Sequence, residues 1–125
     1  MNENLIGERV LGAALKVHIA LGPGLLESAY ETCLSHELRL DGLAHVRQLT
    51  LPVTYRGQLI ETAYRLDLLV EEKVVVEVKS VDAIADVHRA QLLSYLRLGG
   101  YRLGYLLNFN APLLRSGIVR LANAL

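Results

Sequence analysis

Residues 64–79 read YRLDLLVEEKVVVEVK, two runs of aliphatic residues separated by three charged ones. Short apolar runs bounded by a polar segment are typical of two β-strands joined by a hairpin. Because side chains alternate between the two faces of a strand, Glu77 and Lys79 are predicted to share one face of the second strand, with valines on the other. The stretch therefore predicts a buried hairpin that carries charged residues in its interior.

The length of the hairpin loop decides where Asp67 lies. A three-residue loop at 71–73 pairs Val70 with Val74, and counting back along the antiparallel strands places Asp67 directly opposite Glu77. Asp67, Glu77 and Lys79 then converge on one face of the sheet. A loop of two or four residues sends Asp67 to the opposite face, so the convergence depends on this register.

Two converging carboxylates favour a metal ion. At about 5 Å they repel each other, and a partly dry sheet makes this costly unless a cation lies between them. Oxygen ligands suit Mg²⁺ or Mn²⁺, which can hold a phosphate and lower the pKa of a bound water, while Lys79 orients that water or neutralises phosphoryl charge. The alternative is a solvent-facing sheet surface on which Lys79 pairs weakly with Asp67 or Glu77.

Composition limits the classes of protein to consider. The 125 residues are 52% hydrophobic and 21% charged, which indicates one folded domain over residues 1–125. Thirteen basic residues balance thirteen acidic ones, so bulk positive charge does not drive nucleic-acid binding. The single cysteine, Cys33, excludes disulfide scaffolds, cysteine zinc sites and iron–sulfur clusters and is expected in the core. Without a long apolar run or a basic N-terminal segment, we expect a cytoplasmic protein.

The remaining sequence predicts an α/β layer fold in the order ααβββαββ, with a mostly apolar central strand covered by helices. Helices are expected at about 4–21, 25–40 and 83–98, and strands at about 45–55, 59–70, 74–81, 101–109 and 118–121. Pro52 indicates a sheet edge or a bulge.

Two helices offer further candidate site residues. Glu27 lies one helical turn before Tyr30, so Glu27 is a candidate third acidic ligand. The helix dipole alone also favours a glutamate there, and Tyr30 is equally suited to the core. In the last predicted helix, Gln91 and Tyr95 share a face with His88 and present an amide and a phenol to a phosphate or base. The alternative is a polar edge on a partly exposed helix.

Several motifs together resemble those of the GxxExxY protein family, and they cover nearly the whole chain: Val17-His18, Leu21 to Tyr30 (LGPGLLESAY), Arg65-x-Asp67, Glu77-Val78-Lys79, Gln91-x-x-x-Tyr95 and Asn108-Phe109-Asn110. That family is grouped with the PD-(D/E)XK nuclease superfamily and its RecB-like members. The resemblance implies a restriction-endonuclease-like core (αβββαβ), a central mixed sheet flanked by helices, with the metal site on the central hairpin.

The resemblance also implies roles for individual residues. Asp67 and Glu77 are expected to hold Mg²⁺ together with the Val78 carbonyl, Lys79 is expected to be the catalytic lysine, and Glu27 is expected to be the upstream helical acid. Leu66 takes the place of the proline that usually precedes the first aspartate in the superfamily.

Gln91 and Tyr95 match the glutamine–tyrosine motif of RecB-type members, and with Tyr30 they are expected to contact substrate. The expected function is metal-dependent hydrolysis of phosphodiester bonds in DNA, with RNA as second choice, by a metal-activated water. One alternative is a non-catalytic nucleic-acid-binding or protein-assembly module that keeps the fold within a homodimer or larger complex. Another is a phosphohydrolase that acts on a small molecule. No membrane partner is expected.

Overall fold

A five-stranded sheet forms the centre of the computed structural model, which describes residues 1–125 except for the side chains of Thr62 and Ala63. The elements are α1 (Glu3–Leu21), α2 (Glu27–Leu40), β1 (His45–Tyr55), β2 (Gln58–Val70), β3 (Val74–Lys79), α3 (Asp86–Gly99), β4 (Leu103–Asn108), the short 3₁₀ helix η1 (Leu114–Gly117) and β5 (Ile118–Ala122).

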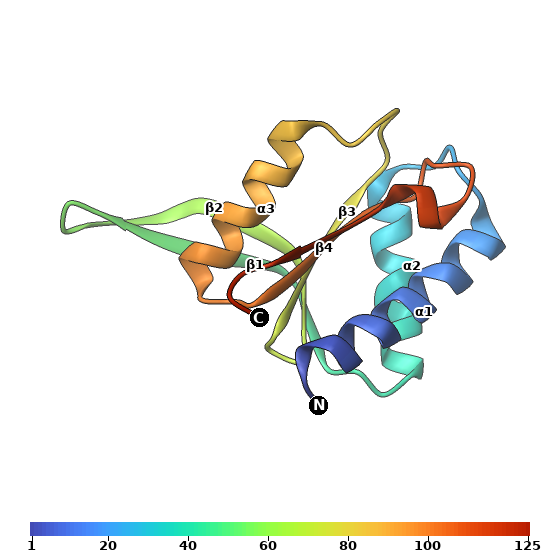
Figure 1. Ribbon diagram of the computed structural model, residues 1–125, viewed down its shortest axis with the longest axis horizontal. Helices are drawn as coiled ribbons and strands as arrows, with labels where there is room; N and C mark the ends of the chain where they lie inside the picture. The colour runs from blue at the N-terminus through green and yellow to red at the C-terminus, as the bar shows by residue number, and fades with distance from the viewer.

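The sheet has the order β1-β2-β3-β4-β5 and is mixed. β3 and β4 are parallel and α3 connects them, whereas every other neighbouring pair is antiparallel. Helices α1 and α2 cover one face and α3 covers the other (Figure 1). The predicted α/β fold, with a central mixed sheet flanked by helices, is confirmed.

The alternation predicted for β3 is confirmed by its packing. Val74, Val76 and Val78 belong to the core beneath α1 and α2. Val75 belongs to the second core, where it packs with Leu92 of α3 and its neighbours. Glu77 alternates in phase with Val75, so its side chain leaves β3 on the face that α3 covers.

Gly104 of β4 lets α3 lie close to the sheet. A Cβ atom built at this position would lie 2.9 Å from Cδ1 of Leu92 and 3.0 Å from Cδ2 of Leu96, tighter than side-chain contacts tolerate. The missing side chain therefore sets the depth of α3 and with it the positions of Gln91 and Tyr95.

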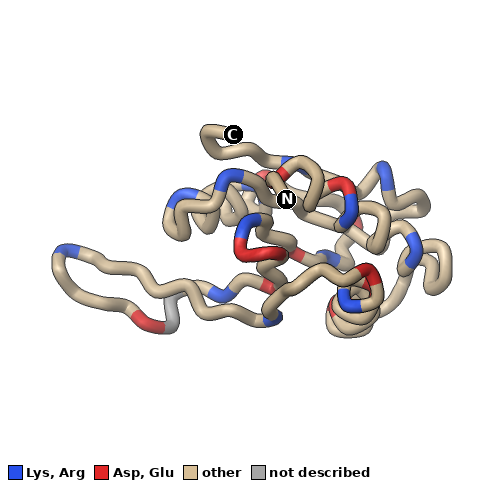
Figure 2. Tube along the Cα trace, turned by 90° about the horizontal axis from the view of Figure 1, so that it is seen from below, with Lys and Arg blue, Asp and Glu red and all other residues tan. Residues whose placement is uncertain are grey.

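The hairpin of β1 and β2 extends beyond the body of the molecule (Figure 2). Its register shifts between Leu51 and Val53, on either side of Pro52, and β1 is an edge strand, so the sheet edge or bulge predicted at Pro52 is confirmed. The reversal at the tip uses two residues, Arg56 and Gly57, both with positive φ.

Some helices and strands begin or end two or three residues from the predicted position, because side chains form hydrogen bonds with the backbone there. β3 ends at Lys79 rather than at Val81, since the Asn108 side chain bonds both the N–H and the carbonyl of Val81. α3 begins at Asp86, after the His88 ring accepts a hydrogen bond from the Ala85 N–H. None of the described helices has the length and apolar character needed to cross a bilayer.

Candidate active site

Asp67 and Glu77 face each other across β2 and β3. The observed pairs Val70–Val74 and Leu68–Val76 show the predicted three-residue loop, and Asp67 and Glu77 are the next residues along each strand, just beyond the last of these pairs. The Asp67 N–H donates to Glu77 Oε2 at 2.7 Å, and the Val78 N–H donates to Asp67 Oδ2 at 2.8 Å. The predicted register and the convergence of the two carboxylates are confirmed.

Both carboxyl groups resist ionisation in this setting. The Glu77 side chain is buried, with 5% of the residue exposed, and burial followed by repulsion from Asp67 raises its pKa to about 8. Burial also raises the pKa of Asp67; the Val78 hydrogen bond opposes this rise and the charge of Glu31 adds to it. The two groups are therefore held together at a free-energy cost when both are ionised.

Lys79 supplies a positive charge that acts on both carboxyl groups of this pair. It lies two residues beyond Glu77 on β3, so the two side chains leave the strand on the same face. Its charge lowers the pKa of both Asp67 and Glu77 against the larger effect of burial. One lysine therefore compensates only part of the charge of two carboxylates.

The donor set of this pair fits a hard cation. Among the described residues, Glu77 Oε1 accepts no hydrogen bond, and Asp67 Oδ1 accepts only a long one of 3.4 Å from Gln48. An oxygen without a bonded donor on Glu77 and a weakly bonded oxygen on Asp67, both on carboxyl groups with raised pKa values, suit Mg²⁺ or Mn²⁺. No group of three or more His, Cys, Asp and Glu side chains is arranged to hold a metal in the part of the chain whose side chains are described. The protein thus offers two carboxylates, and backbone or water oxygens must complete a shell.

Glu31, Arg47 and Gln48 join this site, and the sequence reading missed all three. Arg47 donates to Glu31 Oε2 through Nε at 3.0 Å and Nη2 at 2.9 Å. Gln48 Nε2 donates to Glu31 Oε1 at 2.6 Å and to Asp67 Oδ1 at 3.4 Å. A chain of contacts therefore runs from α2 through β1 to the acid on β2.

A left-handed backbone at Gln48 makes these contacts possible. Its φ is 53°, a region that residues other than glycine seldom occupy. Gln48 has no paired partner on β2, although its neighbours Arg47 and Leu49 do. The pairing of β1 with β2 is therefore interrupted at Gln48, the residue whose side chain bonds Glu31 and Asp67.

Glu27 lies beside the lysine end of β3 rather than against the acid pair. Its Oε2 accepts a hydrogen bond from the Ser80 N–H at 3.2 Å, and the Ser80 hydroxyl donates to the Leu25 carbonyl at 2.6 Å. The loop before α2 is thereby tied to the residue that follows Lys79. The role of Glu27 as a metal ligand stays a prediction, while Glu31, one turn further along α2, is the helical acid whose charge reaches Asp67 and Glu77.

The Tyr30 side chain is not exposed to solvent, as the predicted contact with substrate would require. The residue is 0% exposed, its ring stacks on Phe109 with centroids 4.7 Å apart, and its hydroxyl donates to the Gly22 carbonyl at 2.5 Å. The same oxygen accepts a hydrogen bond from the Leu25 N–H at 3.1 Å. Tyr30 therefore belongs to the core and holds the loop before α2, as the alternative had it.

Gln91 and Tyr95 lie on α3, on the same side of the sheet as Glu77. The half-buried Tyr95 ring packs against Tyr64 of β2 with centroids 5.3 Å apart. Burial, followed by the charges of Glu77 and Asp67, raises the pKa of the Tyr95 phenol. Gln91 is exposed. An aromatic pair therefore lies close to the carboxylates, with an amide one turn away on the same helix.

Replacing Arg47 with methionine is expected to lower the free energy of unfolding by about 1–2 kcal/mol. The Glu31 carboxylate, 10% exposed, would lose both hydrogen bonds from its only ion-pair partner among the described residues. Urea denaturation measures the change, and Arg65→Met, on the neighbouring strand, is the matched control because Arg65 is exposed. Equal losses in the two variants would contradict a specific role for the Arg47–Glu31 pair.

Comparison with known proteins gives one family match. A model of the PD-(D/E)XK nuclease superfamily matches residues 4–121 of the chain. Neither the curated proteins nor the solved structures provide a match.

Proposed function

The chain belongs to the PD-(D/E)XK nuclease superfamily, and from this membership we propose that it hydrolyses phosphodiester bonds of DNA, and of RNA less readily, with Mg²⁺ or Mn²⁺. The observation that carries the proposal is the pair of the half-buried Asp67 and the buried Glu77, with Lys79 two residues beyond Glu77 on β3. Both acids have raised pKa values, and each accepts a backbone hydrogen bond on one oxygen. Residues that act in catalysis commonly combine such perturbed pKa values with a fixed geometry.

The residues that would hold the cation are Asp67, Glu77 and the carbonyl of Val78, with Glu27 bound directly or through water. When bound, a divalent cation lowers the pKa of a water molecule and neutralises charge on the phosphate. The Val78 N–H donates to one oxygen of Asp67 at 2.8 Å, and Gln48 of β1 donates to the other through a long contact of 3.4 Å. These bonds fix the orientation of the carboxylate before any ligand arrives.

Lys79 acts on the reacting groups. Its ammonium group holds the attacking water by a hydrogen bond and offsets negative charge that builds on a phosphoryl oxygen. The regular alternation of β3 aims Lys79 to the face of Glu77, and the Glu27–Ser80 bond anchors the residue that follows it.

Substrate contacts come from α3 and the neighbouring strand. Tyr95 and Tyr64 offer aromatic surface on which a base can stack, and Gln91 offers an amide to a phosphate or base edge. A chain with zero net charge gains little from long-range attraction, so these short-range contacts carry much of the binding.

We further propose that the chain falls within the GxxExxY family, whose motif corresponds to Gly24, Glu27 and Tyr30. Each of these residues has a distinct contact. Gly24 has a φ of 98°, and its N–H donates to the Asn110 side chain at 3.1 Å; Glu27 bonds the Ser80 N–H; Tyr30 fills the core. The three residues thus tie the loop before α2 to the core and to the segment that follows Lys79, which gives the motif a physical reason.

The test is a cleavage assay with labelled single-stranded DNA, duplex DNA and RNA of one sequence, each with Mg²⁺, Mn²⁺ or EDTA. We expect cutting of DNA with either metal, slower cutting of RNA, and none with EDTA. The Asp67→Asn protein, purified in parallel, is the control and should be inactive. If wild-type protein cuts nothing although Mn²⁺ raises its melting temperature, the nuclease proposal fails and a non-catalytic binding or assembly module replaces it.

A further inference from the structure

The outer part of the β1–β2 hairpin projects from the molecule (Figure 2). It consists of residues 52–61, the distal parts of both strands with the turn between them, and we call it the arm. Its strands stay paired to the turn, with Val53 opposite Ile60 and Tyr55 opposite Gln58. None of the described helices covers the arm (Figure 1). Both faces of this two-stranded ribbon are therefore open to a ligand.

One face of the arm is apolar and aromatic. Val53 and Tyr55 follow Leu51 at every second position of β1, so these three side chains share a face. Leu51 is buried in the core beneath α3, so this is the face of the sheet that α3 covers further in. Ile60 lies on the same face because it pairs directly with Val53, and Tyr55 is 63% exposed and Ile60 40% exposed. Because an isolated ribbon gains little stability from such side chains in water, their exposure here is typical of a binding surface.

This face of the arm leads to the acid pair. Tyr64 lies opposite Leu51, where the arm joins the body, and its ring packs against Tyr95 of α3 with centroids 5.3 Å apart. Burial, followed by the charges of the acid pair, raises the pKa of the Tyr95 phenol, so Tyr95 lies within electrostatic reach of both carboxylates. From Leu51 to the end of β1 the face is about 14 Å long. We call the following side chains the strip: Val53, Tyr55, Ile60 and Tyr64.

The charges of the arm favour a single strand over a duplex. Between positions 53 and 60 the only charged residue is Arg56, in the turn, and the chain has no net charge. Proteins hold duplex DNA mainly through basic residues on its phosphates. A single strand, in contrast, exposes base faces that stack on aromatic side chains. The strip therefore offers a contact that a single strand can use and a duplex cannot.

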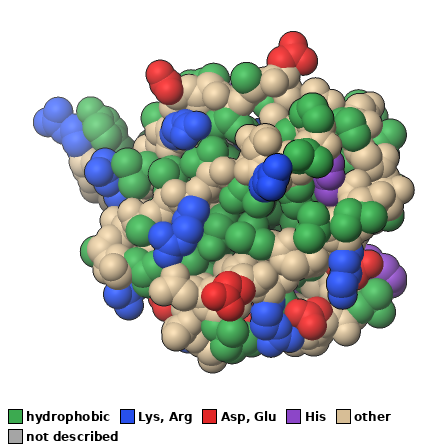
Figure 3. Space-filling view, turned by 45° about the vertical axis from the view of Figure 1, so that its right-hand side comes forward, with side chains coloured by type: hydrophobic (Ala, Val, Ile, Leu, Met, Phe, Trp, Pro, Cys, Tyr) green, Lys and Arg blue, Asp and Glu red, His purple; other side chains and the backbone are tan. Residues whose placement is uncertain are grey.

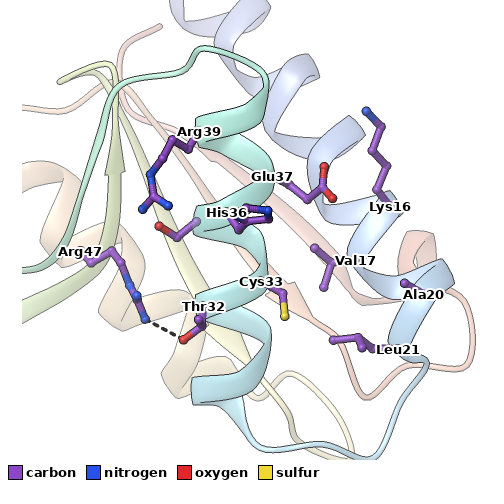
Figure 4. A pocket seen from close by; sticks show the side chains of 11 residues that line it. Lys16, Val17, Ala20, Leu21, Thr32, Cys33, His36, Glu37, Arg39 and Arg47 are labelled. Carbon is purple, nitrogen blue, oxygen red and sulfur yellow. Dashed lines mark hydrogen bonds between the residues drawn. The ribbon is translucent and has the colours of Figure 1, made fainter.

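A second apolar surface, beside α1 and α2, does not have this relation to the acid pair. Figure 3 shows apolar side chains over the middle of that face with charged side chains around them. The hollow there, of about 490 Å³, has Lys16 and Glu37 at one edge and Arg39 on the other side of α2 (Figure 4). Among the described residues, none that lines this hollow forms a hydrogen bond with the acid pair. Of the two surfaces, only the strip is continuous with the candidate active site.

We propose that the strip binds single-stranded DNA that extends from the acid pair along the arm, with a base stacked on Tyr55 and others packed on Val53 and Ile60. Arg56 in the turn offers a positive charge to a phosphate of the bound strand. The inference rests on the proposed function, because it names the form of DNA that the same site takes. A duplex with a single-stranded tail satisfies it as well as a free single strand does.

Fluorescence anisotropy in EDTA tests the inference without cleavage, with the Asp67→Asn protein as the parent. Three labelled probes of one length, about 15 nucleotides, are compared. They are an oligothymidine, the same strand in a blunt duplex, and an abasic strand that keeps the phosphates and lacks the bases. We expect the oligothymidine to bind on the order of tenfold more tightly than either of the others, because only it presents free base faces.

Variants on the two faces of the arm give the test its controls. Tyr55→Ala should raise the Kd for the oligothymidine about tenfold, whereas Tyr55→Phe keeps the ring and should bind as the parent does. Leu59→Ala is the matched control, because Leu59 is 50% exposed and lies opposite Thr54 on the other face of the arm. It should leave the Kd unchanged. Melting temperatures show that each variant is folded.

The inference is overturned by equal binding of the oligothymidine and the duplex, by equal binding of the abasic strand, or by equal effects of Tyr55→Ala and Leu59→Ala. A concentration-dependent dimer that Tyr55→Ala dissociates also overturns it and reassigns the strip to a second copy. Cleavage is a separate result. If wild-type protein cuts DNA but Tyr55→Ala binds as the parent does, the inference alone fails. If binding depends on Tyr55 but wild type cuts nothing, the strip stands and the proposed hydrolysis fails.

Discussion

Lys79→Met is expected to lower kcat for phosphodiester cleavage on the order of 10²–10³-fold. The substitution keeps the length of the side chain and removes the ammonium group that, in the proposed mechanism, holds the attacking water and offsets phosphoryl charge. Asp67 and Glu77 stay in place, because their backbone hydrogen bonds come from Asp67 and Val78 and not from the lysine. Single-turnover cleavage of labelled DNA at saturating Mn²⁺ measures the effect.

A matched lysine on the same hairpin provides the control. Lys73 is exposed and its ammonium group donates to the Met1 carbonyl at 2.7 Å, away from the acid pair. Lys73→Met should cleave at the wild-type rate, and both variants should keep the rise in melting temperature caused by Mn²⁺. If Lys79→Met cleaves as fast as Lys73→Met, Lys79 has no role in the reaction.

Glu77→Gln is expected to stabilise the metal-free protein at high pH. The pKa of this carboxyl rises from an ordinary 4.5 to about 8 on folding, so the folded protein retains a proton that the unfolded chain releases. The stability contributed by this group is fully present below about pH 4.5 and is lost as pH rises through about 8. At ~1.4 kcal/mol for each pH unit between the two values, the loss is on the order of 5 kcal/mol.

Urea denaturation in EDTA at pH 5.5 and pH 9 measures this difference. The variant should exceed wild type by several kcal/mol at pH 9 and by much less at pH 5.5. Glu72→Gln, at an exposed position of the hairpin loop, should follow wild type at both pH values. Mg²⁺ should stabilise wild type at pH 9 and should stabilise Glu77→Gln far less. A wild-type protein that is as stable at pH 9 as the Glu77→Gln protein would contradict the raised pKa.

The central hairpin was predictable because its signals are local. The loop of three residues at 71–73 sets the pairing of Val70 with Val74, and the alternation of valines in β3 sets the faces. Counting along the sequence therefore predicted that Asp67 lies close to Glu77, and a hydrogen bond joins these two residues. The irregular pairing near Pro52 was predictable for the same reason, because the missing N–H belongs to a single residue.

The contacts from α2 and β1 were not predictable in this way. The bonds of Gln48 to Glu31 and Asp67 accompany a left-handed backbone at Gln48, a conformation that sequence analysis expects mainly at glycine. Glu31 and Arg47 lie 16 positions apart in the chain, so their ion pair leaves no local pattern. The one available signal was that Glu31 follows Glu27 by four residues, which places both on the same side of α2. A pattern of single residues does not tell which of two such acids reaches the sheet.

Tyr30 shows the converse error. Its place in a family motif suggested a substrate contact, but its ring fills the core against Phe109 and its hydroxyl joins Gly22 to Leu25. Cys33, expected in the core, packs against it and also lines a hollow beside α1, because one side of α2 faces the sheet and another faces solvent. Helical spacing identifies a face, and the packing of neighbouring elements decides how much of that face is covered.

A metal site between Asp67 and Glu77 is tested most directly by a calorimetric titration of the protein with Mn²⁺ at pH 7. The titration is run in two buffers whose ionisation enthalpies differ, because the difference in heat gives the number of protons released on binding. With the Glu77 pKa at about 8, a cation that takes both carboxylates must displace about one proton, and the release should fall toward zero at pH 9.5. Asp67→Asn should bind Mn²⁺ at least tenfold more weakly. Binding without proton release at pH 7, or equal binding by wild type and Asp67→Asn, would contradict a metal site between Asp67 and Glu77.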